Sequence, residues 1–151
     1  MITTLDNTNH THADFKNGNP LTFVSCHVKP IINQSSDFKL YYEQFDESRE
    51  IAIAFLFDKN QHSIGYAIAP YGSINHIEFP IRELVKISLI TNTKSIILTH
   101  HHPSGNAIPS DCDINNTKKI NNTLKNVTID LYDHKIYSLT GFFSFKVDGL
   151  I

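Results

Sequence analysis

Residue types that bind metal ions follow an apolar run near the middle of the chain. The run Ile96-Ile97-Leu98 leads into His100-His101-His102, and Asp113 follows one loop later. Histidines two positions apart on an extended backbone point the same way, so His100 and His102 can share one ion. Two imidazoles and a carboxylate leave one position open for water, as in catalytic zinc centres. The spacing predicts a site with His100, His102 and Asp113 as ligands. It favours zinc and leaves other divalent transition metals open.

The loop between the histidines and Asp113 must fold back for the three ligands to meet. Pro103 and Pro109 restrict it, and Gly105 permits a tight turn. Ser110 followed by Asp113 is also typical of a capping box at the start of a helix. That interpretation is compatible with a metal site, because a cap holds both side chains rigidly. Three consecutive histidines in a solvated loop remain the alternative.

A hydrolytic zinc site also needs a base for its water. The candidates are Glu50, Glu78 and Glu83. Glu50 directly precedes an apolar strand and can point into a site from the sheet edge. Glu83 is expected on the solvated face of a helix, and Glu78 on a strand surface. The pattern alone favours Glu50 over Glu83 only mildly.

Composition limits the class of protein. The chain has 151 residues and a formal net charge of -2, which fits one globular domain and argues against a strongly basic nucleic-acid surface. Cys26 and Cys112 form no C-x-x-C, so we expect no disulfide framework and a reducing, cytoplasmic location. We find no signal peptide and no apolar run of membrane length, so no membrane contact is expected.

We expect a flexible N-terminal arm over residues 1–20 and one domain over residues 21–151. The histidines His10 and His12 of the arm lack a following carboxylate, so we do not expect them to bind metal. The run Ile51–Phe57 predicts a strand buried on both faces, hence central in a sheet. The other predicted strands are 21–26, 63–69, 95–99, 129–132, 135–139 and 142–147.

Helical spacing predicts three helices, which begin near Ser36, Pro80 and Ser110. Lys118, Lys119 and Lys125 lie on the last helix and indicate a solvated face rather than a DNA contact. The residues expected to face the core are Ile81, Leu84, Val85, Ser88 and Leu89 in the second helix, and Ile114, Thr117, Ile120 and Leu124 in the third.

The histidine segment with Pro109, Ser110 and Asp113 resembles the signature of RadC-like proteins, a branch of the JAMM (MPN) metalloprotease superfamily. The resemblance extends from Phe38 to Phe145. Its other elements are Arg49-Glu50 before the apolar strand with Asp58 after it, Pro80-Ile81-Arg82-Glu83, Thr117-Lys118-Lys119, Asp133-His134 and Ser144-Phe145.

The resemblance implies an α/β (α+β) domain of the cytidine-deaminase-like JAMM/MPN type, with a curved, mostly antiparallel sheet flanked by helices. It makes His100, His102 and Asp113 zinc ligands and gives Glu50 the task of activating the zinc-bound water. Ser110 would position that water or stabilise the oxyanion. The reaction of the superfamily is hydrolysis of amide bonds, often isopeptide bonds.

The chain departs from the family pattern at two positions. His101 stands where Asn is usual and Cys112 where a charged residue is usual, but neither is a ligand position. Since neighbours on a strand alternate sides, we expect His101 to face away from the metal. His134 next to Asp133 either supports the site from behind or makes a strand-end contact.

Three hypotheses follow. The first is a zinc-dependent peptidase or isopeptidase-like hydrolase acting on a peptide or protein substrate. The second is a metal-dependent nuclease or a RadC-type DNA-repair factor. It is weakened by the net charge and by the lack of room for the helix-hairpin-helix region of full-length RadC proteins. The third is a non-catalytic interaction module, with a homodimer formed by exchange of the arm over residues 1–20.

Overall fold

The computed structural model describes residues 12–13, 22–25, 50–69 and 79–151. The strands are β1 His12–Ala13, β2 Thr22–Ser25, β3 Ala52–Phe57, β4 Ser63–Ile68, β5 Ser95–His101, β6 Asp130–Ser138 and β7 Gly141–Ser144. The helices are α2 Ile81–Ile90 and α3 Asp111–Asn126. The expected helix near Ser36 and most of the expected arm lie outside the described residues.

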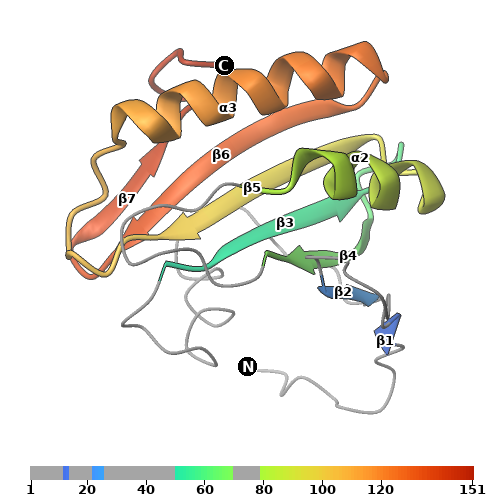
Figure 1. Ribbon diagram of the computed structural model, residues 1–151, viewed down its shortest axis with the longest axis horizontal. Coiled ribbons are helices and arrows are strands. Elements are labelled where there is room, and N and C mark those ends of the chain that lie inside the picture. Colours follow the sequence, from blue (N-terminus) through green and yellow to red (C-terminus); the bar gives the residue numbers. More distant parts are fainter. Residues whose placement is uncertain (1–11, 14–21, 26–49, 70–78) are drawn as a thin grey trace.

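The described strands form one seven-stranded sheet in the order β1-β2-β4-β3-β5-β6-β7 (Figure 1). Every neighbouring pair is antiparallel except β5 and β6, which run parallel and are joined by α3. A parallel pair needs such a crossover, because no tight turn can return the chain to the same end of the sheet. The predicted mixed fold, a mostly antiparallel sheet with helices, is confirmed.

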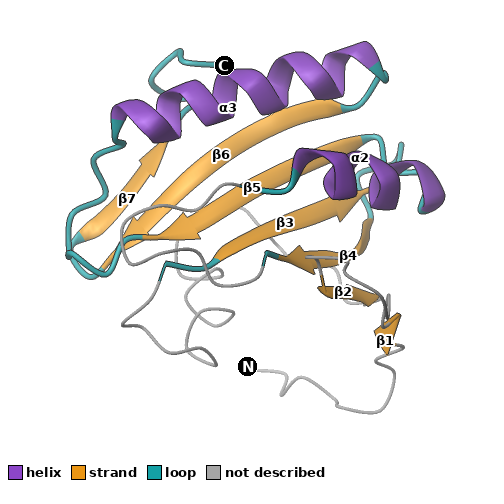
Figure 2. Cartoon of the chain, in the orientation of Figure 1, coloured by secondary structure: helices purple, strands orange, loops and turns teal. Residues whose placement is uncertain are grey.

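The alternation of side chains along β3 divides the core into two clusters. Leu56 of β3 packs with Leu84 of α2 and Leu124 of α3, whereas its neighbour Phe55 belongs to a second cluster. We call the side that carries α2 and α3 the helix face (Figure 2). All six residues of β3 are buried, as predicted for a central strand. Side chains at even positions of β3 and β5 therefore point to the helix face.

The C-terminal part of the sheet differs from the prediction, because the strands expected at 129–132 and 135–139 are one continuous strand, β6. Its pairing with β5 jumps from Leu131 to Asp133, so Tyr132 is an extra residue in the ladder. Such a bulge shifts the alternation by one residue. Leu131 and His134 consequently both point to the helix face, where His134 meets Thr117 of α3.

Strand β7 is shorter than the predicted strand 142–147 and ends at Ser144. The carboxylate of Asp133 accepts hydrogen bonds from Ser144 Oγ at 2.8 Å and from the backbone N–H of Lys146 at 3.1 Å. The backbone N–H of Asp148 then donates to the Ser144 carbonyl. These bonds turn the chain away from the direction of the strand.

The predicted buried stripe of α2 is wrong at one position. Leu84 and Ser88 are buried as expected, but Leu89 is 58% exposed and Ile87 is buried instead. Positions 84, 87 and 88 follow the i, i+3, i+4 spacing of one helix face, so position 89 falls outside it. In α3, Thr117, Ile120 and Leu124 are buried as expected, and Ile114 is half-buried.

Phe145 packs the C-terminal segment of the chain against His134 of β6. Its side chain is fully buried, and its ring stacks on that of His134 with centroids 4.7 Å apart. Replacement by alanine leaves a cavity, so Phe145→Ala should lower the free energy of unfolding by about 3–5 kcal/mol. Urea denaturation measures this. Val147→Ala, at a position 83% exposed, is the control and should stay within about 0.5 kcal/mol. Equal losses would contradict this packing.

Candidate metal centre

Strand β5 presents two histidines to the helix face at its C-terminal end. The backbone N–H of His102 donates to the Tyr137 carbonyl at 2.7 Å, which continues the pairing with β6 one residue beyond β5. His100 and His102 are buried or nearly so and lie on one side of the strand, as the i, i+2 spacing predicts. Their neighbour His101 is half-buried and is not one of the residues grouped at the site.

The carboxylate of Asp113 enters from the first turn of α3. Ser110 is the N-cap of this helix, and its Oγ accepts a hydrogen bond from the Asp113 N–H at 3.2 Å. In return, Asp113 Oδ2 accepts from Ser110 N–H at 2.8 Å and from Ser110 Oγ at 2.6 Å. The capping-box interpretation is therefore confirmed. The cap also orients the Asp113 carboxylate, so the two interpretations of this pair are compatible.

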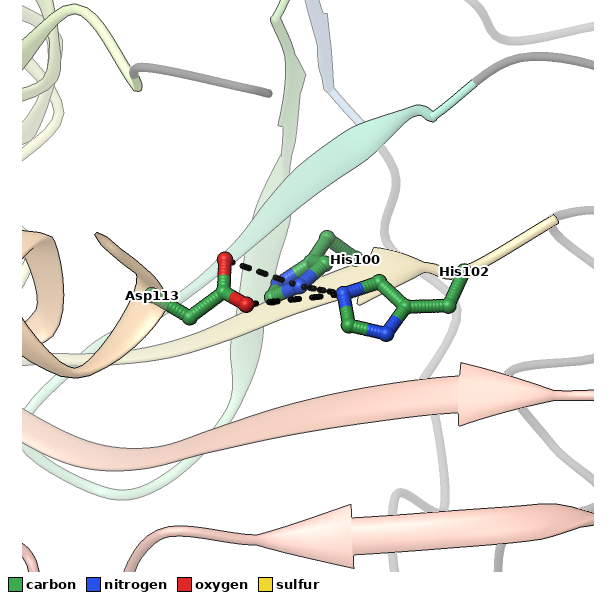
Figure 3. Close-up of side chains that lie close together, drawn as sticks. All are labelled: His100, His102 and Asp113. Carbon is green, nitrogen blue, oxygen red and sulfur yellow. Dashed lines mark hydrogen bonds and ion pairs between the residues drawn. The ribbon is translucent and has the colours of Figure 1, made fainter. Parts of the chain in front are cut away.

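Three potential ligand atoms converge where β5 meets α3 (Figure 3). His100 Nε2 lies 3.4 Å from Asp113 Oδ1, and His102 Nε2 lies 3.6 Å from Asp113 Oδ2. The two Nε2 atoms are 2.9 Å apart. Tetrahedral zinc with bonds of about 2.0–2.1 Å holds its ligand atoms roughly 3.3 Å apart. This His-His-Asp group could therefore hold a metal ion.

Burial and charge set the pKa values of the group. Burial, with help from His134, holds the pKa of His100 well below its ordinary value. Burial alone would lower the pKa of His102, but the interactions with Asp113 and with the Asn106 carbonyl raise it. Burial would raise the pKa of Asp113, yet the neighbouring His102, His100 and Ser110 hold it well below its ordinary value.

These pKa shifts fit a group that could hold a cation. His102 Nδ1 donates to the Asn106 carbonyl at 2.9 Å, so Nε2 is the nitrogen that faces His100 and Asp113. A carboxylate and two imidazole nitrogens this close repel one another unless positive charge lies between them. A divalent ion fits the same nitrogen and oxygen donors.

Glu50 lies beside this group. Ala52 pairs with His100 in the antiparallel ladder of β3 and β5, and the His101 N–H donates to the Ile51 carbonyl at 3.1 Å. Continuing this register by two residues places Glu50 opposite His102, on the helix face. Glu50 lines a cavity of about 460 Å³ together with His102.

The other predicted site residues can be placed relative to the same cavity. Ser110 and Asp113 line it as well. Glu83 lies in the first turn of α2 and does not line it, and Glu78 is outside the described residues. The geometry thus brings together the His-His-Asp group, Ser110 and Glu50, and leaves Glu83 apart.

Sequence reasoning left the surroundings of His100 undecided. His134 Nε2 lies 2.8 Å from His100 Nδ1, and His134 Nδ1 lies 2.7 Å from Thr117 Oγ1. His134 therefore supports the site from behind, while Asp133, its expected companion, bonds elsewhere. Thr117 was expected only to face inward. The sequence feature that could have pointed to His134 and Thr117 is that both lie in motifs shared with the RadC-like family.

The fold and the site together define a domain of the JAMM/MPN superfamily. More narrowly, the chain belongs to the RadC-like JAB domain family, whose model matches residues 32–150. The domains of this superfamily are often metallohydrolases, in keeping with the His-His-Asp group found here.

The relatives are bacterial proteins named UPF0758. One from Aquifex aeolicus (strain VF5) is 27% identical over 121 residues, 80% of this chain and 52% of the relative. One from Alteromonas mediterranea is 32% identical over 130 residues, which are 85% of this chain and 58% of the relative. One from Coxiella burnetii is 34% identical over 114 residues, which are 75% of this chain and 51% of the relative. The chain thus spans about half the length of the curated relatives it matches. Neither helix of the described residues is long and apolar enough to cross a membrane.

The His-His-Asp group makes a direct prediction about metal content. Purified protein loaded with zinc and then desalted should retain about one ion per chain. His102→Ala removes one of the three candidate ligands. Loss of a residue that only hydrogen-bonds a ligand weakens metal binding roughly 10–100-fold, so His102→Ala should weaken zinc binding by more than that. Elemental analysis and calorimetric titration measure both.

The matched control is His101→Ala, because His101 is adjacent in sequence but outside the group. It should bind zinc as the unchanged protein does. Equal zinc content in the His102→Ala and His101→Ala proteins would show that the group is not the metal site.

Proposed function

We propose that the protein is a zinc-dependent hydrolase that cleaves amide bonds of the peptide or isopeptide kind. The observation that carries this proposal is that Glu50 lines the same cavity as His102 and Asp113, two of the three residues of the His-His-Asp group. A carboxylate beside a candidate metal centre is the arrangement that metal-assisted hydrolysis needs. Membership of the RadC-like JAB family supports the same reaction class.

In this proposal His100, His102 and Asp113 hold the zinc ion. Zinc bound there supplies a Lewis acid, which polarises a carbonyl and makes water nucleophilic near neutral pH. The buried, neutral imidazole of His100 and the ionised carboxylate of Asp113 are the protonation states in which these side chains coordinate metal.

Glu50 acts as the general base and then as the general acid. One of its carboxylate oxygens takes the proton from the water that attacks the carbonyl carbon, as the new C–O bond forms. The same oxygen returns the proton to the amine nitrogen when the C–N bond breaks. Its place opposite His102 at the end of the β3–β5 ladder puts it within the cavity where the substrate would lie.

Ser110 has a positioning role in this scheme. Its hydroxyl donates to Asp113 Oδ2 at 2.6 Å and so orients the carboxylate. Binding of an oxyanion by Ser110 would require the hydroxyl to exchange this acceptor for the substrate. We therefore assign Ser110 first to holding Asp113 and second to contact with the substrate.

The volume of the cavity limits the size of the substrate segment that can bind there. Its volume of about 460 Å³ is in the usual range for ligand sites and matches a short stretch of peptide rather than a folded domain. The side chain of Ile108 lines it and is 70% exposed, and Asn106 offers polar groups beside it. We propose that an extended segment of a peptide or protein enters here.

Replacement of the base tests the proposal. Glu50→Gln keeps the size of the side chain but removes the proton acceptor. It should lower the rate of peptide or isopeptide cleavage by about 10²–10⁴-fold while zinc content stays unchanged. A panel of fluorogenic peptide and isopeptide substrates, assayed with zinc-loaded protein, measures this.

Glu83→Gln is the matched control, because Glu83 was the rival candidate and does not line the cavity. It should leave the rate unchanged. Cleavage of DNA but not of peptides, abolished by Glu50→Gln, would replace the proposal with a nuclease. Equal peptide cleavage by the Glu50→Gln protein and the unchanged protein would refute the role of Glu50.

A further inference from the structure

A buried chain of three hydrogen bonds runs behind His100. The Thr117 hydroxyl lies 2.6 Å from the Asp113 carbonyl oxygen and 2.7 Å from His134 Nδ1. His134 Nε2 lies 2.8 Å from His100 Nδ1. The chain thus begins at the backbone of Asp113, passes through α3 and β6, and ends on the ring of His100.

The direction of each bond follows from what each group can donate. The Asp113 carbonyl can only accept, so the single hydroxyl hydrogen of Thr117 points to it. The Thr117 oxygen must then accept the N–H of His134 Nδ1. His134 is buried, and burial favours the neutral imidazole, which has one N–H. His134 Nε2 therefore accepts the N–H of His100 Nδ1.

From this direction we infer that Thr117 and His134 are positioning residues that select the tautomer of His100 in which Nε2 is bare and faces the metal site. The inference rests on the metal site used in the proposed function, and it adds the residues that set the tautomer of one ligand in that site. A neutral imidazole binds a metal ion only through a nitrogen that has no hydrogen. Groups that bond the far nitrogen of a ligand histidine are known to fix its tautomer and orientation.

Neighbouring residues hold the His134 ring between Thr117 and His100. The bulge at Tyr132 turns His134 toward the helix face, and Phe145 stacks on its ring with the two planes 9° apart. Thr117 lies one helical turn after Asp113 on the same side of α3. Asp113 therefore supplies both a ligand carboxylate and the carbonyl at which the chain of bonds begins.

The alternative is that the Thr117 hydroxyl only donates a hydrogen bond to a backbone carbonyl of its own helix, as threonine hydroxyls in helices often do. Thr123 on the same helix does this, since its hydroxyl donates to the Lys119 carbonyl at 2.9 Å. Thr123 thus provides a matched control, because Thr123→Val removes the same bond to the helix without touching a histidine.

The first experiment uses metal-free protein whose histidines carry ¹⁵N, and two-bond ¹H–¹⁵N correlation spectra identify the tautomers. In the unchanged protein His134 and His100 should both carry hydrogen on Nδ1. Thr117→Val keeps the shape of the side chain but removes the acceptor. His134 should then carry its hydrogen on Nε2 and donate to His100 Nδ1, which places the His100 hydrogen on Nε2.

The second experiment is calorimetric titration with zinc alone. Thr117→Val should weaken zinc binding by about 10–100-fold, and Thr117→Ser, which keeps the hydroxyl, should restore it. Thr123→Val should bind zinc as the unchanged protein does. Thermal melts of the metal-free proteins check that the variants compared are folded.

Two outcomes would overturn the inference: an unchanged His134 tautomer in Thr117→Val, or a zinc affinity equal in Thr117→Val and Thr123→Val. Neither readout uses catalysis. A protein that binds zinc with the expected tautomers but cleaves no amide bond would refute the proposed function alone.

Discussion

The pairing of β3 with β5 is the constraint on which the site depends. Because Ala52 lies opposite His100, residues of the same parity on both strands face the helices. A slip of one residue in either strand would reverse every side chain of that strand. A slip of β5 would turn His100 and His102 away from α3, and a slip of β3 would take Glu50 out of the cavity. The buried residues of β3 specify this register, since both of its faces lie against packed side chains.

The helix that crosses between the two parallel strands supplies the remaining charge. The capping box at Ser110 holds the Asp113 carboxylate against two imidazoles in a half-buried setting. Hydrogen bonds and charges nearby outweigh the effect of burial on Asp113 and keep it ionised. The local helix start and the long-range strand pairing thus meet at one point, where a bound cation would offset the mutual repulsion of the donors.

The sequence predicted the features that depend on short spacing. These include the buried strand β3, the helix start at Ser110 and the convergence of His100 and His102 with Asp113, because alternation and capping are local. It did not predict that β6 is one strand or which way His134 points. The direction of His134 depends on the bulge at Tyr132, and both features depend on the pairing of β6 with β5, which is a long-range contact. The contact of His102 with a backbone carbonyl in the loop has no signature in side-chain types at all.

The three candidate ligands all lie in one continuous segment, 100–113, whereas Glu50 comes from a distant part of the chain, just before β3. The candidate metal ligands and the proposed base therefore come from separate parts of the chain. Packing of α3 against β5, with His134 of β6 bonded to His100, brings the three candidate ligands together, and pairing of β3 with β5 adds Glu50. For the proposed hydrolase, substitutions at position 50 would abolish turnover in a descendant protein and leave the ion-binding group intact.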